Sequence, residues 1–228
     1  MDNSSTRKNI LKKIREALTA PSVRLLPESS DGLFYRKDDR SLLDRFCTEF
    51  AAIDGKLEVC REKDDFHKKL SEIRNENGWQ HLYCSTASFR TDFGLDALPF
   101  TGGEVPESAS AVITGCECLV ARTGTIVLSS AQEYGRALTV YTPVHIVVAS
   151  ADQLVEDIGD GISKIVRRYG RKLPSALFFA SGPSRTGDIE KTLVKGVHGP
   201  VQVYLFLFAA NGDYVTDQPG YQSKIIEL

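Results

Sequence analysis

The stretch at residues 181–200, which begins S-G-P-S-R-T-G-D-I-E, separates the apolar run 176–180 from the apolar run 201–209. Its side chains include Ser184, Arg185 and Thr186, which can donate hydrogen bonds to an anion. An arginine fork pairs with a carboxylate or a phosphate through two parallel hydrogen bonds, and Gly182 permits close approach of the backbone. The chemistry that these residue types favour is therefore the binding of a small anion.

The flanking residues predict where this stretch lies in the fold. The run 176–180 is expected to be a strand, and the spacing of Ile189, Leu193 and Val194 predicts a helix after the polar residues. The stretch 182–190 then lies at the carboxyl edge of a parallel strand and at a helix N-terminus, where open α/β sheets bind ligands. In a simpler alternative, a serine or threonine only caps the helix and nearby carboxylates only complement its dipole.

His198 lies between two glycines in G-V-H-G-P at 196–200, where the chain is expected to return to the same sheet edge. A histidine in that place can act as a general acid, a general base or a hydrogen-bond donor. We take His198 and the Asp188 carboxylate as the candidate catalytic residues. The alternative for His198 is a turn residue that tolerates positive φ.

Two other places carry weaker signals. His145, between apolar neighbours in P-V-H-I, is more consistent with a hydrogen-bonded histidine of the core or of a strand edge than with a ligand. Cys116 and Cys118 would point the same way from an extended strand and can chelate or oxidise, although buried thiols are the simpler interpretation. Glu117 would then face the opposite side.

The elements that must position these residues alternate between helices and strands. Periodic apolar residues predict helices at 10–18, 42–53, 64–73 and 152–169, and strands at 57–60, 81–85, 175–180 and 201–209. The run 109–150 is rich in β-branched residues and broken by glycine and proline, which indicates closely spaced strands. Within it we expect a hairpin turn at 122–124 and a strand that starts at Pro143.

This order of elements predicts an α/β fold with a mixed, largely parallel sheet flanked by helices. Residues 20–38 contain two prolines, three serines and a glycine without sustained periodicity, which is typical of a linker. We therefore expect an N-terminal amphipathic helix with its linker at 1–38 and a single α/β domain at 39–228.

Composition limits the class of protein. The net charge of −2 and the isoelectric point near 6.1 give no basic patch of the kind that binds nucleic acid, so small molecules or proteins are the expected partners. Neither a secretory signal nor a membrane span is expected from the sequence. The five cysteines are an odd, scattered set, which favours reduced thiols in a cytoplasmic protein.

Several short blocks, in consistent order over roughly residues 105–210, carry a family resemblance. They are I-T-G at 113–115, A-R-T-G-T-I-V-L at 121–128, G-R at 135–136, P-V-H-I at 143–146, G-P-S-R-T-G-D-I-E at 182–190 and G-V-H-G-P at 196–200. With these blocks the chain resembles the lactate utilization protein C family, whose domain is called LUD. The resemblance implies a fold similar to the sugar-isomerase and CoA-transferase-like class.

The resemblance also implies membership in a three-component system that oxidises L-lactate to pyruvate, in which the other two components look like iron-sulfur carriers. We expect no cofactor and no metal site in this chain itself, and iron-sulfur subunits as its partners. The expected ligand-binding residues are Thr123, Gly124, Thr125, Arg136, Gly182, Ser184, Arg185 and Thr186. In the family pattern A-E-T-G-T, Arg122 replaces the glutamate, so it can join the anion-binding arginines or be a solvated turn residue.

Three functions are compatible with these observations. The first is a non-redox subunit of an iron-sulfur lactate oxidation assembly that binds partner subunits and a small carboxylate or phosphate. The second is a stand-alone transferase or ligase that acts on a phosphorylated or CoA-type substrate. The third is a redox-sensing regulator that uses Cys116 and Cys118.

Overall fold

The computed structural model describes residues 3–19, 38–84, 86–99, 107–132, 142–189, 192–196 and 198–209. The chain divides into two units, Met1–Asp39 and Arg40–Leu228, and each is described by itself. In the first unit, the expected N-terminal helix is present as α1 (Asn3–Thr19). No helix within the described ranges is long and apolar enough to cross a bilayer.

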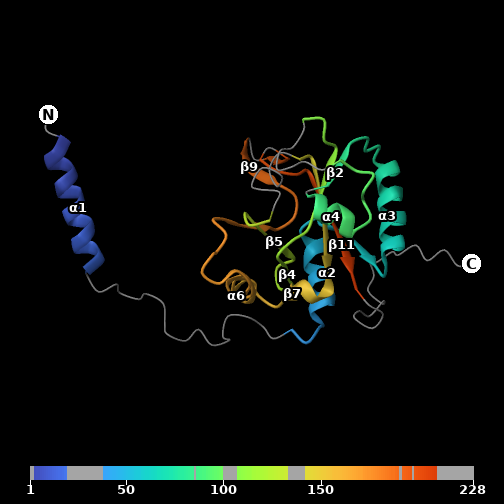
Figure 1. Ribbon diagram of the computed structural model, residues 1–228, viewed down its shortest axis with the longest axis horizontal. Coiled ribbons are helices and arrows are strands. Elements are labelled where there is room, and N and C mark those ends of the chain that lie inside the picture. Colours follow the sequence, from blue (N-terminus) through green and yellow to red (C-terminus); the bar gives the residue numbers. More distant parts are fainter. Residues whose placement is uncertain are drawn as a thin grey trace, which may run out of the picture. The chain divides into compact units, whose positions relative to one another are not determined.

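Five strands of the described chain form one parallel sheet, here called the central sheet (Figure 1). Its order is β1 (Lys56–Cys60), β11 (Gln202–Phe208), β6 (Val144–Ser150), β3 (Ala111–Thr114) and β2 (Leu82–Cys84). β11 pairs with β1 on one side and with β6 on the other. Its almost wholly apolar sequence suits this place, because both faces of the strand are covered. The expected α/β fold with a mainly parallel sheet is confirmed.

Two helices, α3 (Lys63–Glu76) and α4 (Ala87–Asp92), cover one face of the central sheet. There the ring of Phe66 from α3 meets Phe206 of β11 edge to face, with 5.1 Å between the ring centroids. Because side chains alternate along a strand, Leu205 and Leu207 point to the other face. The aromatic contacts hold α3 across the sheet as it connects β1 to β2.

A smaller second sheet and helix α2 (Leu42–Ala52) cover the opposite face. The second sheet has the order β7 (Leu154–Val155), β4 (Cys118–Val120), β5 (Thr125–Ser129) and β8 (Leu177–Ala180). Phe46 and Phe50 of α2 stack on each other and pack with Leu119 and Ile126 of this sheet. β4 and β5 are antiparallel, which confirms the hairpin turn expected at 122–124.

Helix α6 (Ile158–Tyr169) covers the outer face of the second sheet, where Ile165 packs on Cys118, Val120 and Val127. The helix starts six residues later than the sequence pattern indicates. Asp157 forms a capping box with Asp160 that fixes the first turn of the helix at this point. The residues before it form a 3₁₀ turn, η1 (Ala151–Gln153), and β7. Pairing of β7 with β4 therefore overrides the local helical periodicity.

The helix expected after the polar stretch is wrong, because residues Arg185–Ile189 form β9 and residues Thr192–Lys195 form β10. The two strands pair antiparallel as a hairpin. β8 is also antiparallel to its neighbour β5, so the stretch does not follow a parallel strand. Apolar residues four apart lie on one helix face, but here the chain reverses between Ile189 and Thr192, which are cross-strand neighbours. The N-terminal dipole of a helix is consequently absent from this candidate site.

Candidate functional site

Two segments that the sequence singled out meet beside the end of α2. These are the β4–β5 turn and the residues that follow β8, and three hydroxyls connect them. Thr123 Oγ1 lies 2.7 Å from Thr125 Oγ1, which in turn lies 2.8 Å from Ser181 Oγ. The central hydroxyl, of Thr125, is buried, whereas Thr123 is half-buried and Ser181 is exposed, so this hydroxyl row reaches solvent at Ser181.

Gly124 and Gly182 fix these two segments against α2. Gly124 has a φ of +61°, and a Cβ there would lie 2.4 Å from the backbone nitrogen of Phe50. Gly182 has a φ of +79°, and a Cβ there would lie 2.1 Å from the carbonyl oxygen of Ile53. Both glycines are therefore required by left-handed backbone and by close packing on the helix end, whether or not a ligand binds.

Arg185 extends from the start of β9 to Asp54, with 2.7 Å between its Nη2 and Oδ2 of the carboxylate. Both side chains are well exposed, at 39% and 53%, so solvent screens the pair. Asp54 lies two residues beyond the last residue of α2, whose C-terminal end carries the negative end of the helix dipole. An anion that binds Arg185 must compete with this carboxylate and with the dipole.

The remaining predicted residues are distributed around this end of the fold. The Ser184 amide donates to Pro200 O at 2.9 Å and Ser184 O accepts from the Gly196 amide at 3.1 Å, which holds the exposed His198 in the adjoining loop. Thr186 pairs with Val194 in the hairpin. Asp188 belongs to β9, but its side chain is outside the description, and Arg136 lies outside the described residues. The structure thus brings the turn 123–125 and the segment 181–186 together.

Arg122 is neither a solvated turn residue nor part of this cluster. Its guanidinium forms an ion pair with Asp157, the residue that caps α6, and its backbone amide donates to Glu156 O. The hydrogen bond from Arg122 lowers the pKa of Asp157 below its usual value. Arg122 therefore fixes the start of α6 against the β4–β5 turn.

His145 is a buried, hydrogen-bonded core residue, as the sequence suggested. Its Nε2 lies 2.8 Å from Oγ1 of Thr114, on the neighbouring strand β3. The Thr114 hydroxyl donates to Gly115 O at 2.9 Å, so it accepts the hydrogen bond from Nε2–H of the imidazole. Burial lowers the pKa of His145 to about 4, which keeps the ring neutral at physiological pH.

The two close cysteines are both buried but do not share one side of a strand. Cys116 precedes β4 and packs between α2 and the sheets, whereas Cys118 lies in β4 beneath α6. Burial raises the pKa of both thiols, that of Cys118 to about 11. The expectation that they point the same way is wrong, because the chain is regular strand only from Cys118 onward. This separation and the high pKa values disfavour chelation and oxidation by the pair.

Glu117 is a buried carboxylate whose surroundings the sequence did not reveal. It accepts hydrogen bonds from Ser129 Oγ at 2.6 Å and Tyr169 Oη at 2.7 Å, and it pairs with Arg168 at 3.1 Å. Only 1% of its side chain is exposed. The sequence placed Glu117 opposite the cysteines but contained no signal for its partners, which come from β5 and the end of α6. This cluster anchors α6 to the second sheet.

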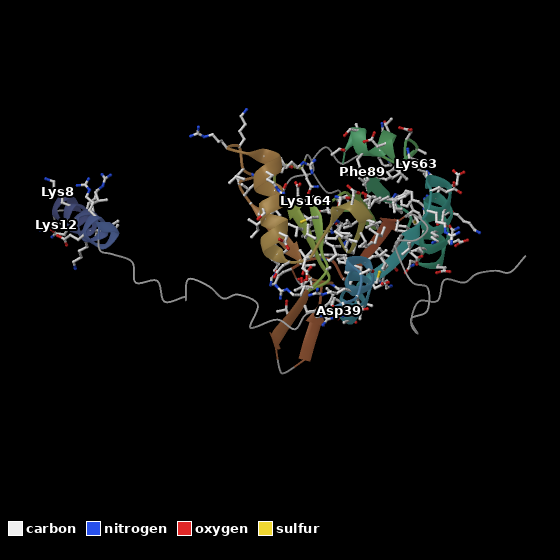
Figure 2. All side chains as sticks on the ribbon, turned by 90° about the horizontal axis from the view of Figure 1, so that it is seen from below. Lys8, Lys12, Asp39, Lys63, Phe89 and Lys164 are labelled. Atoms are coloured by element: carbon white, nitrogen blue, oxygen red, sulfur yellow. The ribbon has the colours of Figure 1, made fainter. Side chains whose placement is uncertain are left out.

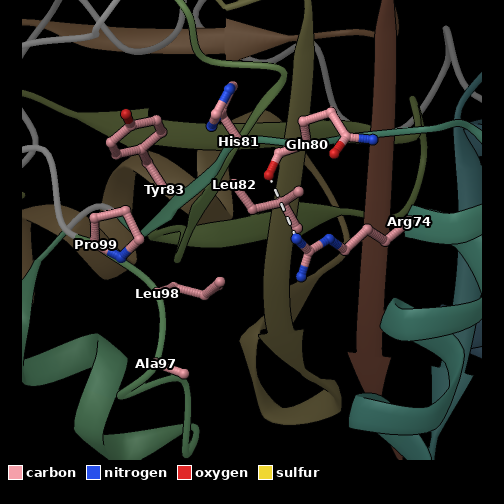
Figure 3. A pocket seen from close by; sticks show the side chains of 8 residues that line it. All are labelled: Arg74, Gln80, His81, Leu82, Tyr83, Ala97, Leu98 and Pro99. Atoms are coloured by element: carbon pink, nitrogen blue, oxygen red, sulfur yellow. Dashed lines mark hydrogen bonds between the residues drawn. The ribbon is translucent and has the colours of Figure 1, made fainter.

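A shallow cavity of about 280 Å³ lies elsewhere, beside β2 and the end of α3. Figure 3 shows its lining residues, which are Arg74, Gln80, His81, Leu82, Tyr83, Ala97, Leu98 and Pro99. The Arg74 guanidinium donates to the carbonyl oxygens of Trp79 and Gln80, so it closes the end of α3. None of the predicted site residues lines this cavity. Among the described residues, no three His, Cys, Asp or Glu side chains gather as a metal site requires.

Comparison with known proteins identifies the part of the chain that contains the candidate site. Residues 103–208 match the model of the LUD domain family. This segment of the chain is similar to the LUD domain family. The match spans β3 to the end of β11, so the LUD segment includes the hydroxyl row, Arg185 and the buried His145.

Several curated relatives share part of this sequence. The chain is similar to Lactate utilization protein C of Deinococcus radiodurans, with 39% identity over 114 residues, covering 47% of this chain and 51% of that protein. Lactate utilization protein C of Bacillus subtilis is 35% identical over 104 residues, covering 44% and 43%. The chain thus spans about half the length of the curated relatives that it matches.

One solved structure has the same fold as this chain. It is a DUF162 family protein from Deinococcus radiodurans, with a TM-score of 0.52 and 22% sequence identity. The superposition covers 74% of this chain and 96% of that protein. At this identity the likeness concerns the fold alone.

Proposed function

We propose that this chain is a component of a lactate utilization system that oxidises L-lactate to pyruvate, and that it has no redox centre of its own. The observation that carries the proposal is the LUD domain at 103–208, together with the relatives named Lactate utilization protein C. The oxidation releases two electrons and two protons. In the proposed assembly, iron-sulfur partner subunits accept the electrons, and the assembly lies in the cytoplasm.

The chemistry of the cysteines supports a role without a cluster. An iron-sulfur cluster needs thiolate ligands that lie close together. Cys60, Cys116 and Cys118 lie in three different packing clusters, and burial raises the pKa of each thiol, that of Cys60 to about 12. All five cysteines are free thiols, which suits a reducing compartment.

We propose that a small carboxylate binds beside the hydroxyl row, at Arg185. Ser181 is exposed next to the buried Thr125. The side chain of Arg185 is 39% exposed even though its guanidinium pairs with Asp54. An incoming carboxylate can replace Asp54 as the partner of this arginine. His198, in the loop tied to Ser184, and Asp188 stay the proposed proton-transfer residues, and Arg136 stays a proposed additional ligand.

The transferase or ligase hypothesis has lost its main structural support. It relied on an anion site at a helix N-terminus, and β9 and β10 occupy that part of the chain instead. The redox-sensor hypothesis required accessible, reactive thiols, whereas Cys116 and Cys118 are buried and their pKa values are raised. The lactate utilization role is therefore the function that these observations support best.

The test is anaerobic affinity purification of the tagged full chain from its native cells, with iron analysis, mass spectrometry and an assay of lactate-dependent dye reduction. Co-elution of two iron-sulfur proteins with this activity is the expected result. If the purified chain eluted without partner proteins and showed no activity with lactate, the proposed role in lactate oxidation would be wrong. In the active assembly, Arg185→Gln is expected to raise KM for lactate by about tenfold, and Arg61→Gln, at another exposed arginine, should leave it unchanged.

A further inference from the structure

An exposed apolar surface lies over the outer side of the second sheet. It consists of Ile162 and Val166 on α6, Leu173 in the connection after α6, and Phe179 on β8. These side chains are 42%, 46%, 54% and 42% exposed, respectively. We call this surface the α6–β8 face.

The residues of the α6–β8 face share one side of the sheet. Ile162 and Val166 are four residues apart and therefore neighbours on the helix surface. Phe179 pairs in register with Val127, which is buried beneath α6, so Phe179 points to the side that α6 covers. Gly161 lies against β4 and β7, and Lys164 donates to Asp152 O just before β7. Ile162 and Val166 lie on the other flank of the helix from Lys164, which is the flank on the β8 side.

β8 also has an open edge beside this face. In the part of the chain that the structure describes, β5 is the strand that pairs with β8, and its other side has none. Ala176 O accepts from the Ser130 amide, so alternate residues along β8 direct their backbone groups outward. The N–H and C=O groups of Leu177 and Phe179 are thus placed to pair with an added strand.

The charged side chains of α6 and of the connection after it are mostly cations. Residues 161–187 contain no Asp or Glu, and five cations lie on or directly after α6, at Lys164, Arg167, Arg168, Arg171 and Lys172. Figure 2 labels Lys164 on this helix. Arg168 pairs with the buried Glu117, while Arg167, Arg171 and Lys172 are exposed. This concentration of positive charge contrasts with the net charge of −2 of the whole chain.

We propose that the α6–β8 face is the docking surface for a partner protein with an apolar centre, an acidic rim and an extended segment that adds to β8. Interfaces of this kind have an apolar core and a charged rim in which arginine is enriched. A second copy of the same face would bring like charges together, and a lipid surface offers no backbone groups to pair with β8. The inference rests on the proposed function only for the source of the partner, which is one of the companion iron-sulfur subunits.

The test measures binding of the purified full chain to each purified companion subunit of its lactate oxidation system by calorimetry. Leu173→Glu, in the docking surface, is compared with Leu42→Glu, the same change at an exposed leucine on α2. Leu173→Glu and the double variant Arg171→Glu/Lys172→Glu are expected to weaken binding by about tenfold or more. The affinity of Leu42→Glu for the companion subunit should stay within about twofold of that of the wild type. The affinity of the double variant should depend less on salt concentration than that of the wild type.

Equal affinities of Leu173→Glu, Leu42→Glu and wild type would overturn the docking surface while the proposed function stands. If the wild-type chain bound neither companion subunit, the docking surface and the proposed function would both be wrong. Sedimentation with vesicles of phosphatidylcholine and phosphatidylglycerol, and analytical ultracentrifugation of the chain alone, test the two other occupants. If the wild-type chain bound vesicles and Arg171→Glu/Lys172→Glu abolished that binding, the occupant would be a lipid surface and the proposal would be wrong. If the chain self-associated and Leu173→Glu abolished the self-association, the occupant would be a second copy and the proposal would also be wrong.

Discussion

Lowering the pH from 7 to 4 is expected to destabilise this protein through His145. The pKa of the buried ring is about 4 in the folded protein, against an ordinary value of 6.5 in the unfolded chain. Between these values the unfolded chain binds a proton that the folded protein does not bind, so stability is complete above pH 6.5 and is lost as the pH falls toward 4. The loss from this one group amounts to about 2 kcal/mol at pH 5 and about 3 kcal/mol at pH 4.

The matched variant is His145→Gln, because a glutamine amide can still donate to Oγ1 of Thr114 but does not titrate. Urea unfolding at pH 7, 6, 5 and 4 gives the free energy of unfolding for each protein. Carboxylates contribute acid sensitivity to both proteins, so the prediction concerns the difference between the two curves. The wild type should lose about 2 kcal/mol more than His145→Gln between pH 7 and pH 5. His81→Gln, at an exposed histidine, should behave as wild type. Parallel curves for wild type and His145→Gln would refute the reasoning.

Three further outcomes follow from the packing. Gly182→Ala should lower the free energy of unfolding by about 2–4 kcal/mol in urea titrations, because the new methyl would overlap a carbonyl of α2, whereas Gly78→Ala, with nothing nearby, should cost about 1 kcal/mol. Glu117→Gln should cost about 1–3 kcal/mol, because the ion pair to α6 is lost while a buried amide is left poorly paired, and an unchanged midpoint would contradict this. The thiols of Cys116 and Cys118 should be unreactive toward Ellman's reagent until urea unfolds the protein, and rapid labelling at pH 8 would show that they are accessible.

The elements with strong local signals could be predicted from the sequence. The strand at β11 is an apolar run bounded by turn residues, and α3 carries a regular apolar stripe that ends before a glycine. The turn at 122–124 contains a glycine with positive φ, which a tight hairpin favours. In each case the residues that determine the element are neighbours in the chain, so their spacing is sufficient.

The prediction was wrong where two structures satisfy one local pattern. Residues 185–195 have apolar side chains at helical spacing, but they pair as the antiparallel strands β9 and β10. Helical periodicity likewise extends before α6, where pairing with β4 makes Leu154 and Val155 a strand. Cooperative contacts with distant strands decide such segments, and a window of ten residues does not contain those contacts.

The sequence by itself determined the fold class, the order of most helices and strands, and the residue types that gather at the candidate site. Tertiary structure decided which of these residues meet and what each of them pairs with. Arg185 lies 131 residues from Asp54 in the chain, and Tyr169 lies 52 residues from Glu117. Ion pairs and buried hydrogen bonds form between groups that folding brings within about 3 Å, and chain spacing does not specify such pairs.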